Sequence, residues 1–310
     1  MPEEQWQSSS TRPVLFSSYP KTGSTVLPSL LDRWLRTHPG AGGEMFTWGK
    51  GKHNFLIHGG DGVDTLVVKS HDALADVLAR IRKTPGQLAW LFEALQKQEV
   101  DFFTGRECSI VYMLRNPVAV LFSAINYAKL LYDRDELRNA WLQDGRAERF
   151  FIDMLGLKAI PGVDEYRKYA VQDLPGVELE GLLWRYIDAW GSIPIFDPVE
   201  SFGYFKHVNY YSMLMARTSK SCLLSYEGMM ANDPRMLASL ADLLGIPAQE
   251  LSQAWEAEQR DRSAGRGRYD NAFFRNFHLA TPEPVKSLAA WPRMRRRLLD
   301  HCPALAEVTD

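Results

Sequence analysis

The chain has 310 residues, of which 45% are hydrophobic, and its formal net charge is −2. This length supports a large buried core in one domain or two, and the near-neutral charge argues against general nucleic-acid binding. The three cysteines are widely spaced and suggest neither a metal site nor a disulfide framework. The N-terminus lacks a signal-peptide pattern, and no apolar run approaches the ~20 residues of a membrane span. We therefore expect a soluble, cytoplasmic protein.

The first elements along the chain predict an anion site. Residues 1–12 are polar and predict a disordered arm, and residues 13–310 predict a single domain. Val14–Ser18 predicts a buried strand, and the apolar pattern after Tyr19–Thr25 predicts a helix to about Arg36. The free N–H groups and the dipole of a helix start favour negative charge, and Lys21 adds a positive charge there. A phosphate or sulfonate is therefore expected at this turn.

The rest of the chain predicts an α/β fold. The glycine-rich stretch His38–Gly62 predicts a mobile loop, and residues 132–210 predict a mainly helical lid insertion. Strands alternating with helices predict a central parallel sheet flanked by helices. The further strands are expected at Thr65–Lys69, Cys108–Leu114 and Lys220–Tyr226, and the further helices at Asp72–Lys83, Pro117–Leu131 and Pro234–Leu244.

The order of residues in the turn distinguishes it from the loop of nucleotide triphosphatases. In that loop the lysine follows the second glycine, and a carboxylate at the end of a neighbouring strand holds magnesium. Here Lys21 precedes Gly23, and the strand Cys108–Leu114 is followed by Arg115. The sequence therefore predicts an anion site without a metal, and a kinase-like phosphotransferase is kept as the alternative.

Three further groups of polar residues follow predicted strands or lie near the C-terminus. Arg115 lies at the carboxyl end of a strand, where ligands of open α/β sheets bind, and Ser123 follows about two helical turns later. Lys69–His71 closes another strand, and an imidazole accepts a proton near neutral pH. Arg262–Phe273 is basic and glycine-rich, as expected of a loop that wraps a phosphate. Each group alone is more often structural; their combination favours a functional site.

In this order the segments resemble the soluble, small-molecule sulfotransferases that use 3′-phosphoadenosine 5′-phosphosulfate (PAPS). Tyr19–Thr25 is similar to the 5′-phosphosulfate loop of that family, and Tyr112–Pro117 with Ser123 to its 3′-phosphate motif. Lys69–His71 resembles the segment of the catalytic histidine. Tyr226 matches a tyrosine that contacts adenine, and Arg262–Phe273 fits the C-terminal motif. The resemblance spans roughly residues 14–275.

The resemblance implies that a sulfuryl group is transferred from PAPS to a hydroxyl, or an amine, of a small molecule, and that adenosine 3′,5′-bisphosphate is released. It also implies that the reaction needs no metal. Lys21, Lys69 and His71 are then the catalytic residues, with His71 as the base. The implied donor-binding residues are Lys21, Thr22, Gly23, Ser24, Thr25, Arg115, Ser123, Tyr226, Arg262, Ser263, Ala264 and Arg266.

Some positions depart from the family pattern, and some alternatives stay open. Val26 stands where the family has an adenine-stacking tryptophan, and Trp255 is a candidate to replace it. Ser263 and Ala264 replace a lysine and a glycine, and Arg266 is a candidate to supply the missing charge. The acceptor could instead be a glycan or a protein, or the chain could be a non-catalytic nucleotide-binding module. A monomer and a homodimer are equally compatible with the sequence.

Overall fold

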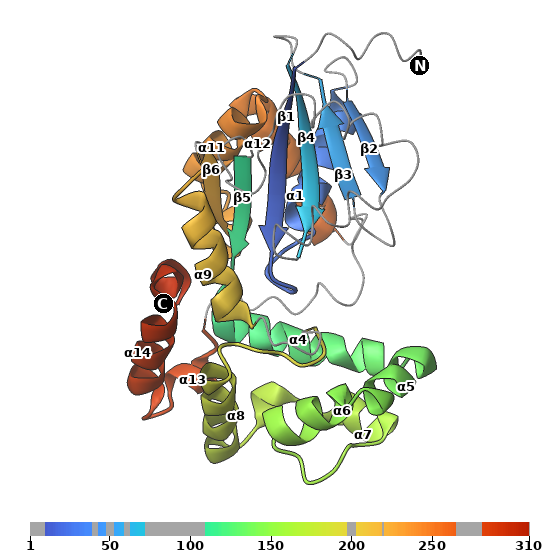
Figure 1. The fold of residues 1–310 in the computed structure, drawn as a ribbon, viewed down its shortest axis with the longest axis vertical. Helices are drawn as coiled ribbons and strands as arrows, with labels where there is room; N and C mark the ends of the chain where they lie inside the picture. Colours follow the sequence, from blue (N-terminus) through green and yellow to red (C-terminus); the bar gives the residue numbers. More distant parts are fainter. Residues whose placement is uncertain are drawn as a thin grey trace. The chain divides into compact units, whose positions relative to one another are not determined.

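The computed structural model describes residues 10–38, 43–47, 53–58, 63–71, 109–196, 203–218, 220–264 and 281–309. The chain forms two compact units (Figure 1). Unit 1 comprises Met1–Ser18, Gly23–Met113 and Tyr211–Asp270, and unit 2 comprises Tyr19–Thr22, Leu114–Tyr210 and Asn271–Asp310. The predicted helix Asp72–Lys83 and the site residue Arg266 lie outside the described residues.

Unit 1 is built on a six-stranded sheet with the strand order β2-β3-β4-β1-β5-β6 (Figure 1). The central strand β1 pairs in parallel with β4 and with β5, whereas β3 pairs antiparallel with β2 and β4. The prediction of an α/β fold with a parallel central sheet is thus confirmed. The strands are β1 (Ser10–Ser18), β2 (Gly43–Thr47), β3 (His53–Ile57), β4 (Val63–Ser70), β5 (Ser109–Leu114) and β6 (Ser221–Ser225).

Two predictions at the N-terminal side of the chain are wrong. The described part of His38–Gly62 holds the strands β2 and β3 instead of a mobile loop. These strands form because the apolar residues of β3 pair with β4, as Phe55 does with Val67. In addition, β1 begins at Ser10, so the last residues of the predicted arm 1–12 belong to the sheet.

One face of the sheet is covered by three helices, α1 (Val26–Thr37), α11 (Pro234–Leu244) and α12 (Ala248–Ser263). Val14 and Phe16 point to this face because side chains alternate along a strand. The helices predicted after Tyr19–Thr25 and from Pro234 are therefore confirmed. An apolar stripe with helical spacing attaches α1 to the sheet and consists of Leu27, Leu30, Leu31 and Trp34.

A short helix, α10 (Tyr226–Met230), follows β6 without a loop. The hydroxyl of Ser225 accepts a hydrogen bond of 3.0 Å from the backbone N–H of Gly228, which caps the helix. The strand consequently ends at Ser225, and Tyr226, which the sequence placed in the strand, is the first residue of the helix.

Unit 2 is mainly helical within the described residues, as predicted for residues 132–210. Its buried aromatic residues pack edge to face, with ring centroids 4.9 Å apart between Tyr132 and Phe151 and 4.8 Å apart between Phe151 and Tyr166. Its helices are α4 (Pro117–Tyr132), α5 (Asp135–Gln143), α6 (Arg146–Glu148), a π-helical segment (Arg149–Met154), α7 (Val163–Lys168), a 3-10 turn (Val171–Asp173), α8 (Gly176–Asp188), α13 (Glu283–Lys286), α14 (Trp291–His301) and a final 3-10 helix (Pro303–Val308). The helix α9 (Tyr204–Met215) begins in unit 2, and its residues from Tyr211 on belong to unit 1.

Among the described residues, every helix is too short or too polar to cross a lipid bilayer.

Candidate functional site

The turn after β1 is stabilised by its own hydrogen bonds. The backbone N–H and the hydroxyl of Thr22 both donate to the carbonyl of Tyr19, at 3.2 and 2.7 Å. Lys21 adopts a left-handed backbone with φ of 71°, which is uncommon for a residue with a side chain. Because such strain is often retained where it serves a ligand, the conformation of Lys21 agrees with its predicted role.

The start of α1 suits an anion. Thr25, the N-cap residue, makes no side-chain cap hydrogen bond, and the first turn of the helix contains no acidic residue. Ser24 and Thr25 are half-buried. The N–H groups and the positive end of the helix dipole are therefore not compensated by a carboxylate of the first turn.

In unit 2, two cations lie together. The guanidinium of Arg115, which is 4% exposed, donates a hydrogen bond of 2.7 Å from Nη1 to the carbonyl of Lys21. The ammonium of Lys21 lies 4.0 Å from the ring centroid of Tyr127. Burial, and then the positive charge of Arg115, lower the pKa of Lys21 from 10.5 to about 8. A bound anion would offset both influences, so these residues fit the sulfate and phosphate groups of the expected donor.

The position of Arg115 is fixed by Tyr204. The backbone N–H of Arg115 donates to the Tyr204 hydroxyl at 3.0 Å, and this hydroxyl donates to the carbonyl of Arg115 at 2.7 Å. Tyr204 is fully buried and belongs to α9, far along the sequence. Sequence reasoning did not assign this role, because no local pattern connects the two residues.

Asn116, the residue after Arg115, caps α4. Its side-chain oxygen accepts hydrogen bonds from the N–H groups of Val118 and Ala119, at 3.0 and 3.1 Å. Asparagine followed by proline is a typical helix start, and this signal was present in the sequence. Ser123 is half-buried on α4, four residues before Tyr127 and hence on the same side of the helix.

In unit 1, His71 lies beside the end of β1. Its Nδ1 is 2.5 Å from the carbonyl oxygen of Ser18. Because a carbonyl only accepts hydrogen bonds, Nδ1 carries the hydrogen, and the lone pair of the neutral ring is on Nε2. Lys69 is buried in β4, and His71 follows the last residue of that strand, Ser70.

Gly23 and Tyr226 are in direct contact. Gly23 has φ of 97°, and a Cβ at this position would lie 2.4 Å from Cδ2 of Tyr226. The Tyr226 side chain is buried, with 3% exposure. The tyrosine that was expected to contact adenine therefore packs on the backbone of the turn.

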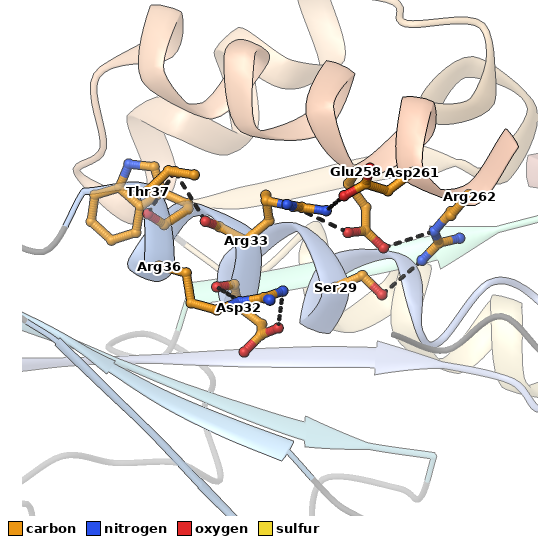
Figure 2. Close-up of polar contacts among 9 residues, drawn as sticks. Ser29, Asp32, Arg33, Arg36, Thr37, Glu258, Asp261 and Arg262 are labelled. Carbon is orange, nitrogen blue, oxygen red and sulfur yellow. Dashed lines mark hydrogen bonds and ion pairs between the residues drawn. The ribbon is translucent and has the colours of Figure 1, made fainter. Parts of the chain in front are cut away.

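Arg262 lies at the first turn of α1 (Figure 2). Its Nε donates to Glu258 Oε1 at 3.0 Å, and its Nη2 donates to Ser29 Oγ at 2.7 Å. Ser263 and Ala264 are exposed at the end of α12.

Trp255 does not replace the tryptophan that is missing at Val26. Its side chain is fully buried in the core of unit 1, and Nε1 donates a hydrogen bond of 2.8 Å to the carbonyl of Met229. Because the ring is enclosed by the core, it cannot stack on adenine, and the expectation that Trp255 replaces the missing tryptophan is wrong.

The structure thus arranges the expected site residues in two sets, one in each unit, and within the described residues no three His, Cys, Asp or Glu side chains form a group that could hold a metal ion. The set in unit 2 consists of Lys21, Thr22, Arg115 and Ser123. The set in unit 1 consists of Gly23, Ser24, Thr25, Lys69, His71, Tyr226, Arg262, Ser263 and Ala264.

Comparisons with known proteins identify the family of the chain. The family model described as "Sulfotransferase domain" matches residues 11–263. A solved structure of mouse sulfotransferase SULT7A1 complexed with PAP is 12% identical, with a TM-score of 0.40, and the similarity covers 94% of this chain and 82% of that chain. A search of curated proteins found no match. Since the family model covers most of the sequence, the chain belongs to the sulfotransferase family and is a PAPS-dependent sulfotransferase.

Proposed function

We propose that the protein transfers the sulfuryl group of PAPS to a hydroxyl, or an amine, of a small-molecule acceptor and releases adenosine 3′,5′-bisphosphate. The observation that carries this proposal is the pairing of Lys21 with Arg115, two neighbouring cations. Burial of the ammonium, and then the charge of Arg115, lower the pKa of Lys21, and a bound anion would favour the charged form again. Such an arrangement is expected of a site that binds a polyanion.

Bound PAPS would supply the reactive sulfuryl group and its phosphate leaving group. The ammonium of Lys21 and the N–H groups at the start of α1 stabilise the negative charge that develops on the leaving oxygen. Arg115 binds the 3′-phosphate with its guanidinium, together with Ser123 and Arg262. Thr22, Ser24 and Thr25 add hydroxyl and backbone donors along the turn.

His71 removes the proton from the acceptor. Because its Nδ1–H is donated to the Ser18 carbonyl, Nε2 is the nitrogen that takes up this proton. The imidazolium that forms keeps its Nδ1 hydrogen bond, so the ring does not have to reorient during the reaction. Lys69 assists by holding the transferring group or the 5′ end of the donor.

The small-molecule acceptor follows from the resemblance to the soluble members of the family. A cytoplasmic location is part of the same proposal, and the described cysteines, Cys222 and Cys302, are buried free thiols, which suits a reducing compartment. A glycan or protein acceptor is the alternative within the same chemistry.

Calorimetry tests the donor. The protein should bind adenosine 3′,5′-bisphosphate tightly in the presence of EDTA, and it should bind ATP with magnesium much more weakly. Equal affinity for ATP with magnesium would contradict the proposal and favour a phosphotransferase.

Sulfur-labelled PAPS then identifies the acceptor class. We expect transfer of the label to phenols or alcohols, or to amines, in a panel of small molecules. If the label were transferred only to sulfate-poor glycans, or only to tyrosine peptides, the acceptor would be that polymer and the proposal of a small-molecule acceptor would be wrong. No transfer to any of these classes, despite tight bisphosphate binding, would favour a non-catalytic binding module.

A further inference from the structure

The last turn of α12 is attached to the first turns of α1 through one buried carboxylate, that of Glu258 (Figure 2). Glu258 is 1% exposed. Its Oε1 accepts the hydrogen bond of Arg262 Nε at 3.0 Å, and its Oε2 lies 3.5 Å from Nε of Arg33. A carboxylate is buried at acceptable cost only when it is paired, and here two guanidinium groups pair with it.

Glu258 and Ser29 together determine the orientation of Arg262. Glu258 holds the Nε edge of the guanidinium, and Ser29 accepts a hydrogen bond from Nη2 at 2.7 Å. Because the guanidinium is planar, two contacts on different edges fix both its position and its plane. In the described part of the chain no residue accepts a hydrogen bond from Nη1. Nη1 is therefore the nitrogen of Arg262 that neither Glu258 nor Ser29 binds.

The place where Arg262 is held is itself favourable for an anion. Ser29 is the fourth residue of α1, whose N-terminal turn contains no acidic side chain. Arg262 thus adds a full positive charge to the positive end of this helix. The face of the guanidinium is supported by Trp255, whose ring centroid lies 5.6 Å from the Cζ atom.

We propose that Glu258 is a positioning residue for the 3′-phosphate of the donor. It aligns Arg262 in advance, so that the guanidinium meets the phosphate without first losing side-chain freedom. This inference rests on the proposed function, because it requires that Arg262 binds the 3′-phosphate.

The chain contains a matched control at the same contact. Asp261 pairs with Arg33 from the neighbouring position of α12, whereas the guanidinium of Arg262 is bound by Glu258 and Ser29. Asp261→Asn therefore removes one negative charge from the contact between α1 and α12, as Glu258→Gln does, but leaves both partners of Arg262 in place.

The experiment compares two ligands by calorimetry. Adenosine 3′,5′-bisphosphate and adenosine 5′-phosphate differ only in the 3′-phosphate, so the ratio of their dissociation constants reports on the contact with that group. Arg262→Gln is expected to reduce the preference for the bisphosphate, and Glu258→Gln is expected to reduce it by about tenfold, the range of a charge-assisted hydrogen bond. Asp261→Asn should leave the ratio unchanged. If the role of Glu258 were purely structural, Glu258→Gln would weaken the binding of both ligands equally and leave the ratio unchanged.

The outcomes separate this inference from the proposed function. If Arg262→Gln reduces the preference and Glu258→Gln does not, the role of Glu258 is wrong and the proposed function stands. If Arg262→Gln also keeps the preference, Arg262 does not bind the 3′-phosphate and the inference is overturned. If the unmodified protein does not prefer the bisphosphate, the proposed function itself fails.

Ser29→Ala covers the case in which Glu258→Gln does not fold. This substitution removes the other group that orients Arg262 and leaves the buried charge pair intact. We expect a smaller reduction of the same preference, and an unchanged ratio would count against the inference.

Discussion

Arg115 donates a hydrogen bond from its guanidinium to the backbone carbonyl of Lys21, over 2.7 Å. The bond brings a second cation beside the lysine, whose backbone is left-handed with φ of 71°. Burial of the ammonium, and then the charge of Arg115, lower the pKa of Lys21 to about 8. The affinity of the protein for anions is therefore expected to depend on pH in a defined way.

The affinity for adenosine 3′,5′-bisphosphate should be constant between about pH 7, where its phosphate groups are largely dianionic, and pH 8, and it should decrease above pH 8. A bound anion favours the charged form of Lys21, so the unprotonated lysine must take up a proton on binding. Above the pKa of about 8, the affinity should fall by up to about tenfold per pH unit. Calorimetry in buffers of different ionisation enthalpy should detect this proton uptake. In the control Lys21→Met the uptake should disappear, and its persistence would assign the titration to another group.

The same shift affects the stability of the protein without ligand. Between the lowered pKa of about 8 and the ordinary value of 10.5, the unfolded chain binds more protons at Lys21 than the folded one does. The contribution of Lys21 to the free energy of unfolding therefore rises as the pH increases through this range. Comparing the pH dependence of urea unfolding for the parent and for Lys21→Met should isolate this contribution.

Replacement of His71 should affect turnover and spare donor binding. His71→Ala removes the proposed base, whose Nδ1 is hydrogen-bonded to the Ser18 carbonyl, so we expect a loss in kcat of roughly 10²–10⁴. The dissociation constant for adenosine 3′,5′-bisphosphate should stay near that of the parent. His38→Ala, at the C-terminal end of α1, is the control and should keep the parental turnover. Parental turnover in His71→Ala would show that another group, or no group, accepts the proton.

Gly23 should not tolerate a side chain. Gly23→Ala places a Cβ 2.4 Å from the Tyr226 ring and strains a backbone with φ of 97°. We expect a loss of about 1–3 kcal/mol in the free energy of unfolding, and weaker donor binding. Gly176→Ala is the control, because among the described residues its Cβ would meet the side chain of Leu288 at 3.6 Å, an ordinary contact. Its stability should match or slightly exceed that of the parent.

A double mutant separates the clash at Gly23 from the backbone strain. If the Tyr226 ring causes part of the loss, Gly23→Ala combined with Tyr226→Ala should cost less than the sum of the two single substitutions. Strict additivity would mean that the backbone conformation alone accounts for the effect.

The hydroxyl of Tyr204 should matter for both stability and binding. Tyr204→Phe leaves the buried N–H and C=O of Arg115 without this partner, and each such group costs about 1–3 kcal/mol. Tyr132→Phe is the control, since its hydroxyl makes one hydrogen bond of 3.0 Å, to the carbonyl of Pro161. We expect a smaller loss of stability there and no change in bisphosphate affinity. Equal effects of the two substitutions would contradict the special role of Tyr204.

The parts of the site that were predictable from the sequence are those formed by consecutive residues. A strand, a lysine, a glycine and a helix start follow one another in Tyr19–Thr25, and helix-terminus physics links them directly to an anion. His71 was likewise predictable as the end of a strand, because β4 has a clear apolar pattern. For such features a short window contains all of the relevant information.

The parts that were missed depend on partners distant in sequence. Tyr204 fixes Arg115 across 89 positions, and Ser29 binds Arg262 across 233 positions. The glycines around β2 and β3 predict a loop, whereas the pairing that makes these segments strands is with residues outside the local sequence. Trp255 appeared free to stack on adenine, although burial against α10 had already determined its place.

The side chain of Asn116 has a consequence for how the protein is handled in the laboratory. Besides capping α4, its Nδ2 donates to the Thr281 hydroxyl at 3.0 Å and to the Val308 carbonyl at 2.8 Å, in a fully buried position. These hydrogen bonds connect Thr281 and Val308, near the C-terminal end of the chain, to the residue next to Arg115. Trimming that tail, or extending it with an affinity tag, is therefore expected to change the binding of the nucleotide proposed for Arg115.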